Sequence, residues 1–301
     1  MRLGLKRVAP LLAACLVVFA GSDSARARII EASERVSVKV KTDAGKTVAQ
    51  DIGVTVFYDT ATATPRPVLV LNHGRSGSPI DRAALRASSY ASAARWFTSL
   101  GFIVALPIRV GYGATGGDDV EDSGLCESKN YPPGFDAAMV QTLAVLDALR
   151  KRADVDKRRA VVVGQSYGGT TAITVAASKP AGVQATINFA GGGGGGPKTH
   201  PQNPCSQAAL LRLFSDYGET ARMPTLWIYS ENDRYFGPQL PRKWFDAFKA
   251  SGGVGEFALF PAVGDDGHLL FSRSPQLWQP RVQEFLRPLG YQPLNPRTAR
   301  K

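Results

Sequence analysis

Hydrophobic and polar residues alternate over two stretches near the start of the chain, ERVSVKV from residue 34 and DIGVTVFYD from residue 51. Alternation is typical of strands with one buried face, so these stretches predict an antiparallel pair. From residue 66 onward the pattern changes to short runs that are apolar on both faces and alternate with helical patterns. Such runs predict a mostly parallel sheet covered by helices on both faces. The runs are RPVLVLNHG, GFIVALPIRV, RRAVVVG, VQATINFA, TLWIYS and EFALFPAV.

The clearest helical pattern is DAAMVQTLAVLDALRKR, residues 136–152. It ends in basic residues, which suit the negative end of a helix dipole. The sequence shows no internal repeat and no long linker, so we expect residues 28–301 to form a single domain. One stripe of the helix carries Met139, Leu143, Leu146 and Leu149, which we expect to face the sheet.

The first 27 residues have the composition of a secretory signal peptide. MRLGLKR carries positive charge, an apolar stretch follows, and Ala25 and Ala27 form a cleavage site. We therefore expect a mature chain that begins at Arg28, is periplasmic or secreted, and has no stable membrane insertion. An uncleaved anchor is disfavoured because the apolar run is shorter than the roughly 20 residues that span a bilayer. Lipidation at Cys15 is the other alternative, and the apolar run that continues past Cys15 argues against it.

The chain is basic, with a net charge of +11, of which residues 1–27 carry +3, so +8 remains on the mature protein. No run of Lys and Arg interleaved with aromatic residues is present, and no nucleic-acid-binding motif is legible. The charge therefore indicates solubility, and nucleic acid is not an expected partner. The sequence leaves the oligomeric state open.

The stretch VVVGQSYGGTT, residues 161–171, contains Gly-x-Ser-x-Gly between a strand pattern and a helix pattern. This is the setting of a nucleophile elbow, in which a sharp turn lifts the serine hydroxyl clear of the sheet. Gly164 and Gly168 suit that turn because side chains there would collide where the helix start folds back on the strand. The setting favours Ser166 as a nucleophile over an accidental glycine-rich turn.

A serine nucleophile needs a base and an acid that orients the base. Of the three histidines, His200 lies among prolines and His73 ends an early strand, so His268, after the last predicted strand, is the expected base. Asp233 follows the strand TLWIYS and is the expected acid. Rival carboxylates are Glu231, Asp265 and Asp266, of which the last two are close to His268 in sequence.

Acyl transfer also needs backbone N–H donors for the developing oxyanion. We expect these donors at Tyr167, which follows the nucleophile, and at Arg75 in the turn NHGRSGS. His73 and Gly74 shape that turn; for His73 the alternative is a hydrogen bond that only fixes the loop.

Two glycine patterns resemble nucleotide-binding loops, and neither fits. GYGATG, residues 111–116, is followed by a loop where a dinucleotide site needs a helix. In GGGGGGPKT, residues 191–199, Pro197 separates the last glycine from Lys198. Both are expected to be flexible loops, the second a hinge or a functional element. No organic cofactor is expected.

Removing Cys15 with the leader leaves Cys126 and Cys205. Their loops are expected at the carboxyl edge of the sheet, and the compartment is oxidising, so we predict a disulfide. Two unrelated buried thiols are the alternative. A metal site is disfavoured because no histidine stands near them at ligand spacing.

The chain resembles the α/β-hydrolase superfamily, and within it the dienelactone hydrolase-like branch of exported bacterial serine hydrolases. The resemblance is carried by LNHGRSG, IRVGYG, VVVGQSYGG, LWIYSENDRYF and DDGH, in order across residues 66–287. It implies a sheet of about eight strands and hydrolysis of a small-molecule ester or acyl substrate without a metal. Dienelactone hydrolases proper use cysteine where this chain has Ser166, so their lactone specificity does not carry over. A peptidase or acyltransferase on the same residues, or a non-catalytic binding protein with this fold, are the alternatives.

Overall fold

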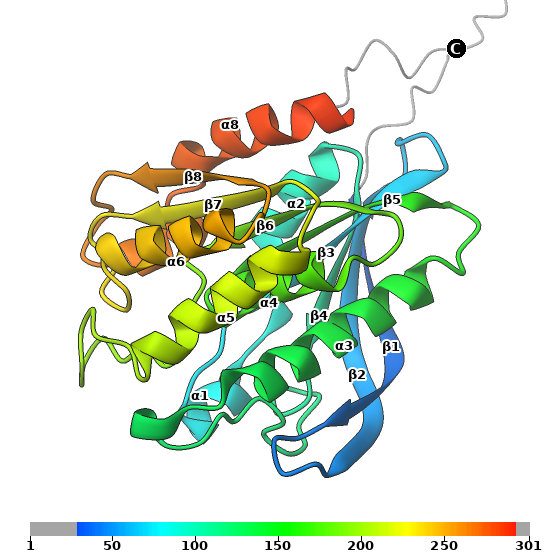
Figure 1. The fold of residues 1–301 in the computed structure, drawn as a ribbon. Helices are drawn as coiled ribbons and strands as arrows, with labels where there is room; N and C mark the ends of the chain where they lie inside the picture. Colours follow the sequence, from blue (N-terminus) through cyan, green and yellow to red (C-terminus); the bar gives the residue numbers. More distant parts are fainter. Residues whose placement is uncertain (1–28, 293–301) are drawn as a thin grey trace, which may run out of the picture.

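The computed structural model describes residues 29–292 and places an eight-stranded sheet at the centre of the protein (Figure 1). The strand order is β1-β2-β4-β3-β5-β6-β7-β8. β2 pairs antiparallel with both β1 and β4, and every other neighbouring pair is parallel. This arrangement confirms the predicted antiparallel pair and mostly parallel sheet. The strands are β1 (Ile29–Lys41), β2 (Thr47–Asp59), β3 (Arg66–Asn72), β4 (Ile103–Ile108), β5 (Val155–Gln165), β6 (Val183–Phe189), β7 (Thr225–Ser230) and β8 (Gly255–Phe260).

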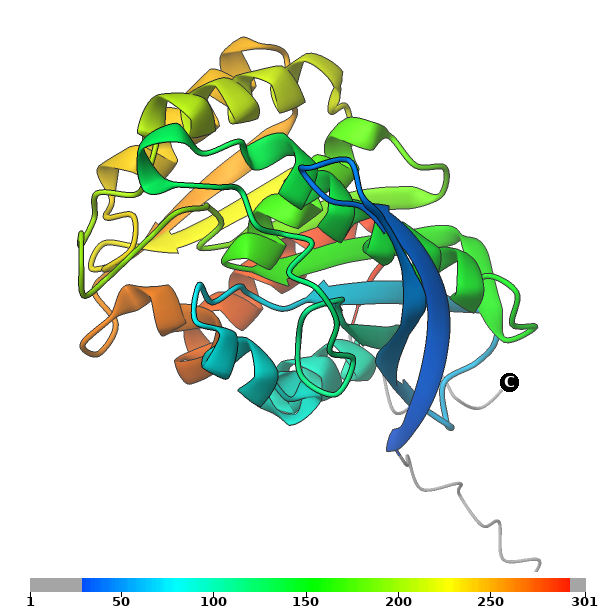
Figure 2. The same cartoon turned by 90° about the horizontal axis from the view of Figure 1, so that it is seen from below.

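Helices cover both faces of the sheet, as Figure 2 shows from below. α3, α4, α5 and α6 pack side by side on one face, and α2, α7 and α8 lie on the other. Central strands bury both faces: in β5, Val161 and Val163 join one core and Val162 joins the other. The helices are α1 (Pro79–Ala84), α2 (Ala91–Ser99), α3 (Tyr131–Leu149), α4 (Tyr167–Ser178), α5 (Gln207–Thr220), α6 (Gln239–Ala250), α7 (Leu270–Arg273) and α8 (Pro275–Leu286).

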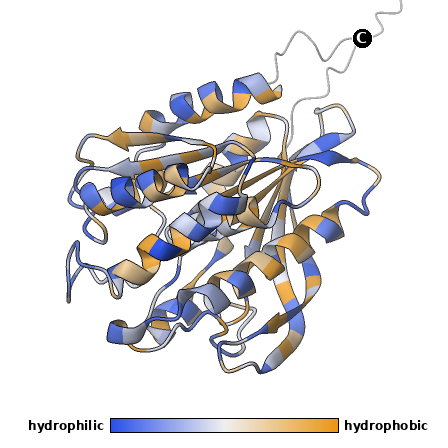
Figure 3. Ribbon diagram, viewed as in Figure 1, coloured by the Kyte–Doolittle hydropathy of each residue, from blue (hydrophilic) through white to orange (hydrophobic). Residues whose placement is uncertain are grey.

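Hydrophilic and hydrophobic residues alternate along the turns of these helices (Figure 3), as expected for helices with one face on a core. α3 begins at Tyr131, five residues before the predicted start, because prolines are tolerated in the first turn of a helix. Its predicted stripe packs against the core: Leu146 and Leu149 are buried, and Met139 and Leu143 are half-buried against the same cluster. Polar Gln141 and Thr142 are buried as well, which the pattern did not predict.

Those two polar residues are buried because they tie α3 to the strand ends below it. The backbone N–H of Val110 donates to Gln141 Oε1 at 2.8 Å, and the Thr142 hydroxyl donates to Asn72 Oδ1 at 2.9 Å. A hydrophobicity pattern cannot find such residues because their burial depends on partners far away in sequence.

The leader, Cys15 and the proposed start at Arg28 lie outside the described residues. Within residues 29–292, no helix has both the length and the hydropathy needed to cross a bilayer.

Candidate active site

Ser166 occupies the sharp turn between β5 and α4, with φ of +57° and ψ of −124°. Such a backbone conformation costs a serine roughly 1–3 kcal/mol and places its side chain at the carboxyl edge of the sheet. The turn is tight enough to need the two flanking glycines. A Cβ on Gly164 would overlap the carbonyl of Gly168, and one on Gly168 would overlap the carbonyl of Asn72.

The structure brings His268 and Asp233 to this serine. His268 Nε2 lies 2.9 Å from Ser166 Oγ, and His268 Nδ1 lies 3.0 Å from Asp233 Oδ2. Asp233 follows β7, and His268 lies in a 3-10 turn after β8. Because an ionised carboxylate only accepts, Nδ1–H donates to Asp233 and Nε2 is free to accept the hydroxyl proton of Ser166. The three side chains thus form one continuous hydrogen-bonded chain.

Asp233 is fully buried, and its other oxygen is also occupied. Oδ1 accepts the backbone N–H groups of Tyr235 at 2.8 Å and Phe236 at 3.1 Å. These bonds hold the carboxylate in one orientation beneath His268. The His268 ring is only 4% exposed, because Tyr235 stacks on it with ring centroids 3.9 Å apart.

The rival carboxylates lie elsewhere. Asp266 Oδ1 accepts the backbone N–H of His268 at 3.0 Å and that of Arg234 at 3.1 Å, so Asp266 caps the turn rather than orienting the ring. Asp265 and Glu231 are exposed.

The predicted oxyanion donors, Arg75 and Tyr167, line the same pocket as Ser166. The peptide between Gly74 and Arg75 is held by His73, whose Nδ1 lies 2.7 Å from the Gly74 carbonyl oxygen. His73 Nε2 lies 3.2 Å from the backbone nitrogen of Arg109 and must accept its proton, so the neutral ring carries its hydrogen on Nδ1. In a trans peptide the C=O and N–H point in opposite directions. Holding the Gly74 carbonyl therefore also orients the Arg75 N–H.

The pKa of His73 is held well below its ordinary value of 6.5, first by complete burial and second by the charge of Arg109. The folded protein therefore keeps His73 neutral at pH values where the unfolded chain takes up a proton. Stability rises with pH wherever the unfolded state binds more protons, so the contribution of His73 is complete above pH 6.5 and is lost as pH falls below it.

We predict that the free energy of unfolding falls by about 1 kcal/mol per pH unit below about pH 6 through this one residue. Urea unfolding of the wild type and of His73→Asn at a series of pH values measures it. The variant is expected to be less stable at neutral pH, but its free energy of unfolding should fall less steeply as the pH is lowered. Parallel profiles would show that His73 does not cause the slope.

Two pockets flank Ser166, each of about 220 Å³, and they share Arg75, Ser166 and Tyr235. We call the first the glycine-lined pocket, since Gly192–Gly195 form one of its walls, and the second the Tyr90 pocket. The rest of the glycine-lined pocket is formed by Gly77, Ser123, Cys126, Lys129, Tyr131, Tyr167, His200, Cys205 and Phe236. The Tyr90 pocket adds Gly74, Ser76, Asp81, Arg82, Leu85, Tyr90, Tyr112, Gln165, His268 and Leu269.

The six-glycine run of residues 191–196 is packed against side chains rather than left in solvent. A Cβ on Gly192 would overlap the Phe236 ring, and one on Gly194 would overlap the Tyr131 hydroxyl. From beneath, the Tyr229 hydroxyl donates to the Gly191 carbonyl at 2.9 Å. Aromatic rings therefore approach the bare backbone closely, which explains the glycines better than the expected flexible hinge does.

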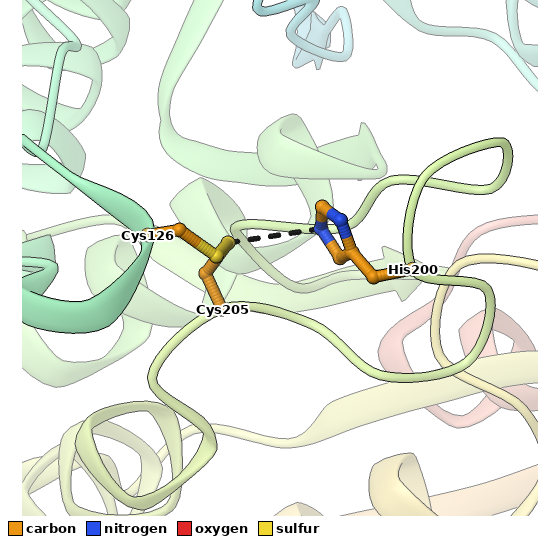
Figure 4. A group of neighbouring side chains, drawn as sticks. All are labelled: Cys126, His200 and Cys205. Carbon is orange, nitrogen blue, oxygen red and sulfur yellow. Dashed lines mark hydrogen bonds between the residues drawn. A yellow bond between two sulfur atoms is a disulfide. The ribbon is translucent and has the colours of Figure 1, made fainter.

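A disulfide joins Cys126 to Cys205 in the wall of this pocket, with the two Cα atoms 4.8 Å apart (Figure 4). His200 lies beside it with Nε2 3.6 Å from Cys205 Sγ, so the expectation that no histidine stands near the two cysteines was wrong. The two sulfurs and the His200 ring lie within 4.8 Å of one another. Sulfurs in a disulfide are not thiolates, so this group offers metal ligands only after reduction. Proximity of His200 to Cys205 in the sequence was the available signal.

We predict that reducing this disulfide destabilises the protein by roughly 2–5 kcal/mol, because the bond closes a long loop with a sequence separation of 79. The fold should persist, since Ser206 Oγ bridges the same loops through the Cys126 carbonyl at 2.8 Å and the Lys129 N–H at 3.1 Å. Discrimination among substrates should also fall, because one pocket wall loosens.

Thermal unfolding with and without a phosphine reductant measures the effect. Cys126→Ser combined with Cys205→Ser is the control and should be insensitive to the reductant. Peptide mapping without reduction that finds two alkylatable thiols at these positions would contradict the bond.

An open, mostly parallel sheet with helices on both faces and a serine elbow at its carboxyl edge defines an α/β-hydrolase. Within this class, residues 57–273 match the dienelactone hydrolase family, and the chain belongs to that family. No curated protein matches its sequence.

Solved structures with the same fold include an esterase from Pyrococcus furiosus, at 15% identity and a TM-score of 0.55, covering 85% of this chain and 90% of that one. An acetyl xylan esterase from a Paenibacillus species has 16% identity and a TM-score of 0.55, covering 87% and 88%. An acylaminoacyl peptidase from Pyrococcus horikoshii has 14% identity and a TM-score of 0.53, covering 85% of this chain and 41% of that one. At these identities the likeness shows the fold alone.

Proposed function

We propose that the protein is an exported serine hydrolase that cleaves carboxylic esters or related acyl bonds through an acyl-serine intermediate. The observation that carries this proposal is the continuous chain from Ser166 through His268 to the buried Asp233. Membership of the dienelactone hydrolase family supports hydrolysis of an ester.

In the first half-reaction, Ser166 Oγ attacks the carbonyl carbon of the substrate while His268 Nε2 takes the hydroxyl proton. Asp233 keeps the other ring proton on Nδ1 and stabilises the imidazolium that forms. The backbone N–H groups of Tyr167 and Arg75 stabilise the oxyanion. His268 then returns its proton to the leaving alcohol oxygen as the bond to the acyl carbon breaks. Water, deprotonated by His268, releases the acid and restores Ser166.

The two pockets on either side of Ser166 suit the two parts of such a substrate. Tyr131 and Phe236 give the glycine-lined pocket apolar walls, and Lys129 also lines it, with its ammonium donating to the Gly124 carbonyl. The Tyr90 pocket has more charged side chains in its wall, because Asp81 and Arg82 line it beside Arg75, which both pockets share. One substrate group in each pocket would place the scissile carbonyl at Ser166.

A fluorophosphonate probe tests the central claim, because it labels only an activated serine. The proposal expects one label, at Ser166, which a non-catalytic binding protein would not take. p-Nitrophenyl esters of graded chain length, with matched anilides, then separate an esterase from a peptidase. Added alcohol acceptors detect an acyltransferase by the transesterified product. Hydrolysis of anilides in preference to esters would overturn the ester assignment.

Export of a single domain of residues 28–301 is part of the same proposal, supported by the disulfide. The amino-terminal sequence of the protein recovered from the periplasm or the medium tests it. A mature chain that begins at Arg28 is expected, and a chain that retains Met1 or carries a lipid on Cys15 would contradict it.

A further inference from the structure

Gln165, the residue before the nucleophile, connects two loops of the site through its side-chain amide. Its Oε1 lies 3.1 Å from the Tyr90 hydroxyl, and its Nε2 donates to the backbone carbonyl of His268 at 3.3 Å. The Tyr90 hydroxyl also lies 3.1 Å from the backbone nitrogen of Gly74. Tyr90 ends a 3-10 turn between α1 and α2 and borders the pocket named after it.

The two ends of this hydrogen-bond network determine which group donates in each of its bonds. The Gly74 N–H can only donate, so the Tyr90 oxygen accepts from it and donates its own proton to Gln165 Oε1. The Gln165 amide then has one orientation, with Nε2–H directed to the His268 carbonyl, which can only accept. Burial raises the pKa of Tyr90, so the hydroxyl keeps its proton over the working pH range. All three bonds are therefore satisfied together.

This hydrogen-bond network connects two loops of the site that are not neighbours in the sheet. Gly74 belongs to the turn after β3, whose next backbone N–H is that of Arg75, and His268 follows β8 at the far end of the sheet. β5, which ends at Gln165, is separated from β8 by β6 and β7. Packing at the turn is also close, since a Cβ on Gly74 would lie 3.2 Å from Ser166 Cβ and 3.3 Å from Gln165 Oε1. A shift of Gln165 would therefore displace the turn and the base loop together.

We propose that Tyr90 and Gln165 are positioning residues. They hold the turn after β3, which carries the Arg75 N–H, and the loop that carries His268 in the correct positions relative to Ser166. The proposal rests on the proposed function, since it assigns these residues to acyl transfer at that site. Neither residue transfers a proton to substrate. Both act through the placement of Arg75 N–H and His268.

Tyr90→Phe, Gln165→Met and the double variant test the proposal, because they remove the polar atoms and keep most of the volume. Tyr291→Phe is the matched control. The Tyr291 hydroxyl donates to Gln184 Oε1 at 2.6 Å, so this variant removes a Tyr–Gln hydrogen bond away from both pockets.

We expect each single variant to lower kcat by about tenfold to a hundredfold, since small misplacements of catalytic groups have effects of this size. KM should stay within about twofold, because the two substitutions keep the shape of the pocket wall and remove polar atoms that bond to the protein. The kcat of the double variant should be no lower than that of the more impaired single variant, as expected for residues that act through one hydrogen-bond network. Tyr291→Phe should leave kcat unchanged. In nuclear magnetic resonance spectra, Gln165→Met should shift the backbone amide of Gly74, which donates to the Tyr90 hydroxyl that Gln165 holds.

Three results would overturn the proposal: kcat of Tyr90→Phe equal to that of Tyr291→Phe, losses that multiply in the double variant, or an unmoved Gly74 amide in Gln165→Met. These results differ from a failure of the proposed function. A wild-type protein that neither takes the fluorophosphonate label nor hydrolyses esters refutes the function, and with it the catalytic role of Tyr90 and Gln165.

Discussion

Ser166→Ala is expected to lose nearly all turnover, on the order of 10⁵ to 10⁶ in kcat, because it removes the hydroxyl that lies 2.9 Å from His268 Nε2 and that receives the acyl group in the proposed mechanism. The thermal midpoint should stay close to that of the wild type. Alanine adopts the same positive φ at similar cost, and removing one half-buried hydroxyl at a pocket opens no core cavity.

Initial rates on a p-nitrophenyl ester and differential scanning calorimetry of the same preparation provide the two readouts. Ser178→Ala is the matched control, since Ser178 ends the helix that Ser166 precedes and donates its hydroxyl to the Val175 carbonyl at 2.9 Å. Substantial turnover by Ser166→Ala, in a preparation free of contaminating esterase, would end the nucleophile assignment.

Asp233→Asn is expected to cost about 10⁴ in kcat, the second-largest effect. An amide in this buried position can present its NH₂ group to His268 Nδ1, which favours the ring tautomer with hydrogen on Nε2. That tautomer cannot accept the proton of Ser166. The backbone N–H groups of Tyr235 and Phe236 would hold the amide oxygen and enforce this orientation.

Asp265→Asn and Asp266→Asn are the comparisons for Asp233→Asn. Asp265 is exposed and should have little effect, while Asp266 should show a modest loss because it caps the turn that carries His268. Steady-state kinetics of the three variants at one pH, with melting temperatures alongside, rank them. A larger loss at Asp265 or Asp266 than at Asp233 would assign the acid elsewhere.

The fold was largely predictable because its determinants are local in the sequence. Each central strand is a short run that is apolar on both faces, and β3 and β7 match the predicted runs closely. The elbow could be recognised for the same reason, because Gly164, Ser166 and Gly168 lie within five residues. The close contact of Gly164 is with Gly168 itself, whereas that of Gly168 is with Asn72 at the end of β3.

Features that depend on long-range contacts could not be read in the same way. Tyr90 meets Gln165 across 75 residues, and no local pattern distinguishes it from an ordinary aromatic residue of the core. His200 is close to the disulfide because the chain folds back at Gly196, whose carbonyl accepts the His200 N–H at 2.8 Å. From the sequence, the glycine run indicated a flexible segment. The aromatic rings that occupy the space where side chains of this run would lie come from other parts of the fold, so the sequence could not show them.

The positive φ at Ser166 has an evolutionary consequence. A serine at this backbone position is less stable than a glycine, which adopts such angles without steric cost. In a lineage that kept this fold only to bind a ligand, mutation to glycine would improve folding and meet no opposing selection. Selection for stability would then replace the serine. Its presence at a positive φ, 2.9 Å from a buried imidazole, is what the proposed nucleophilic role predicts.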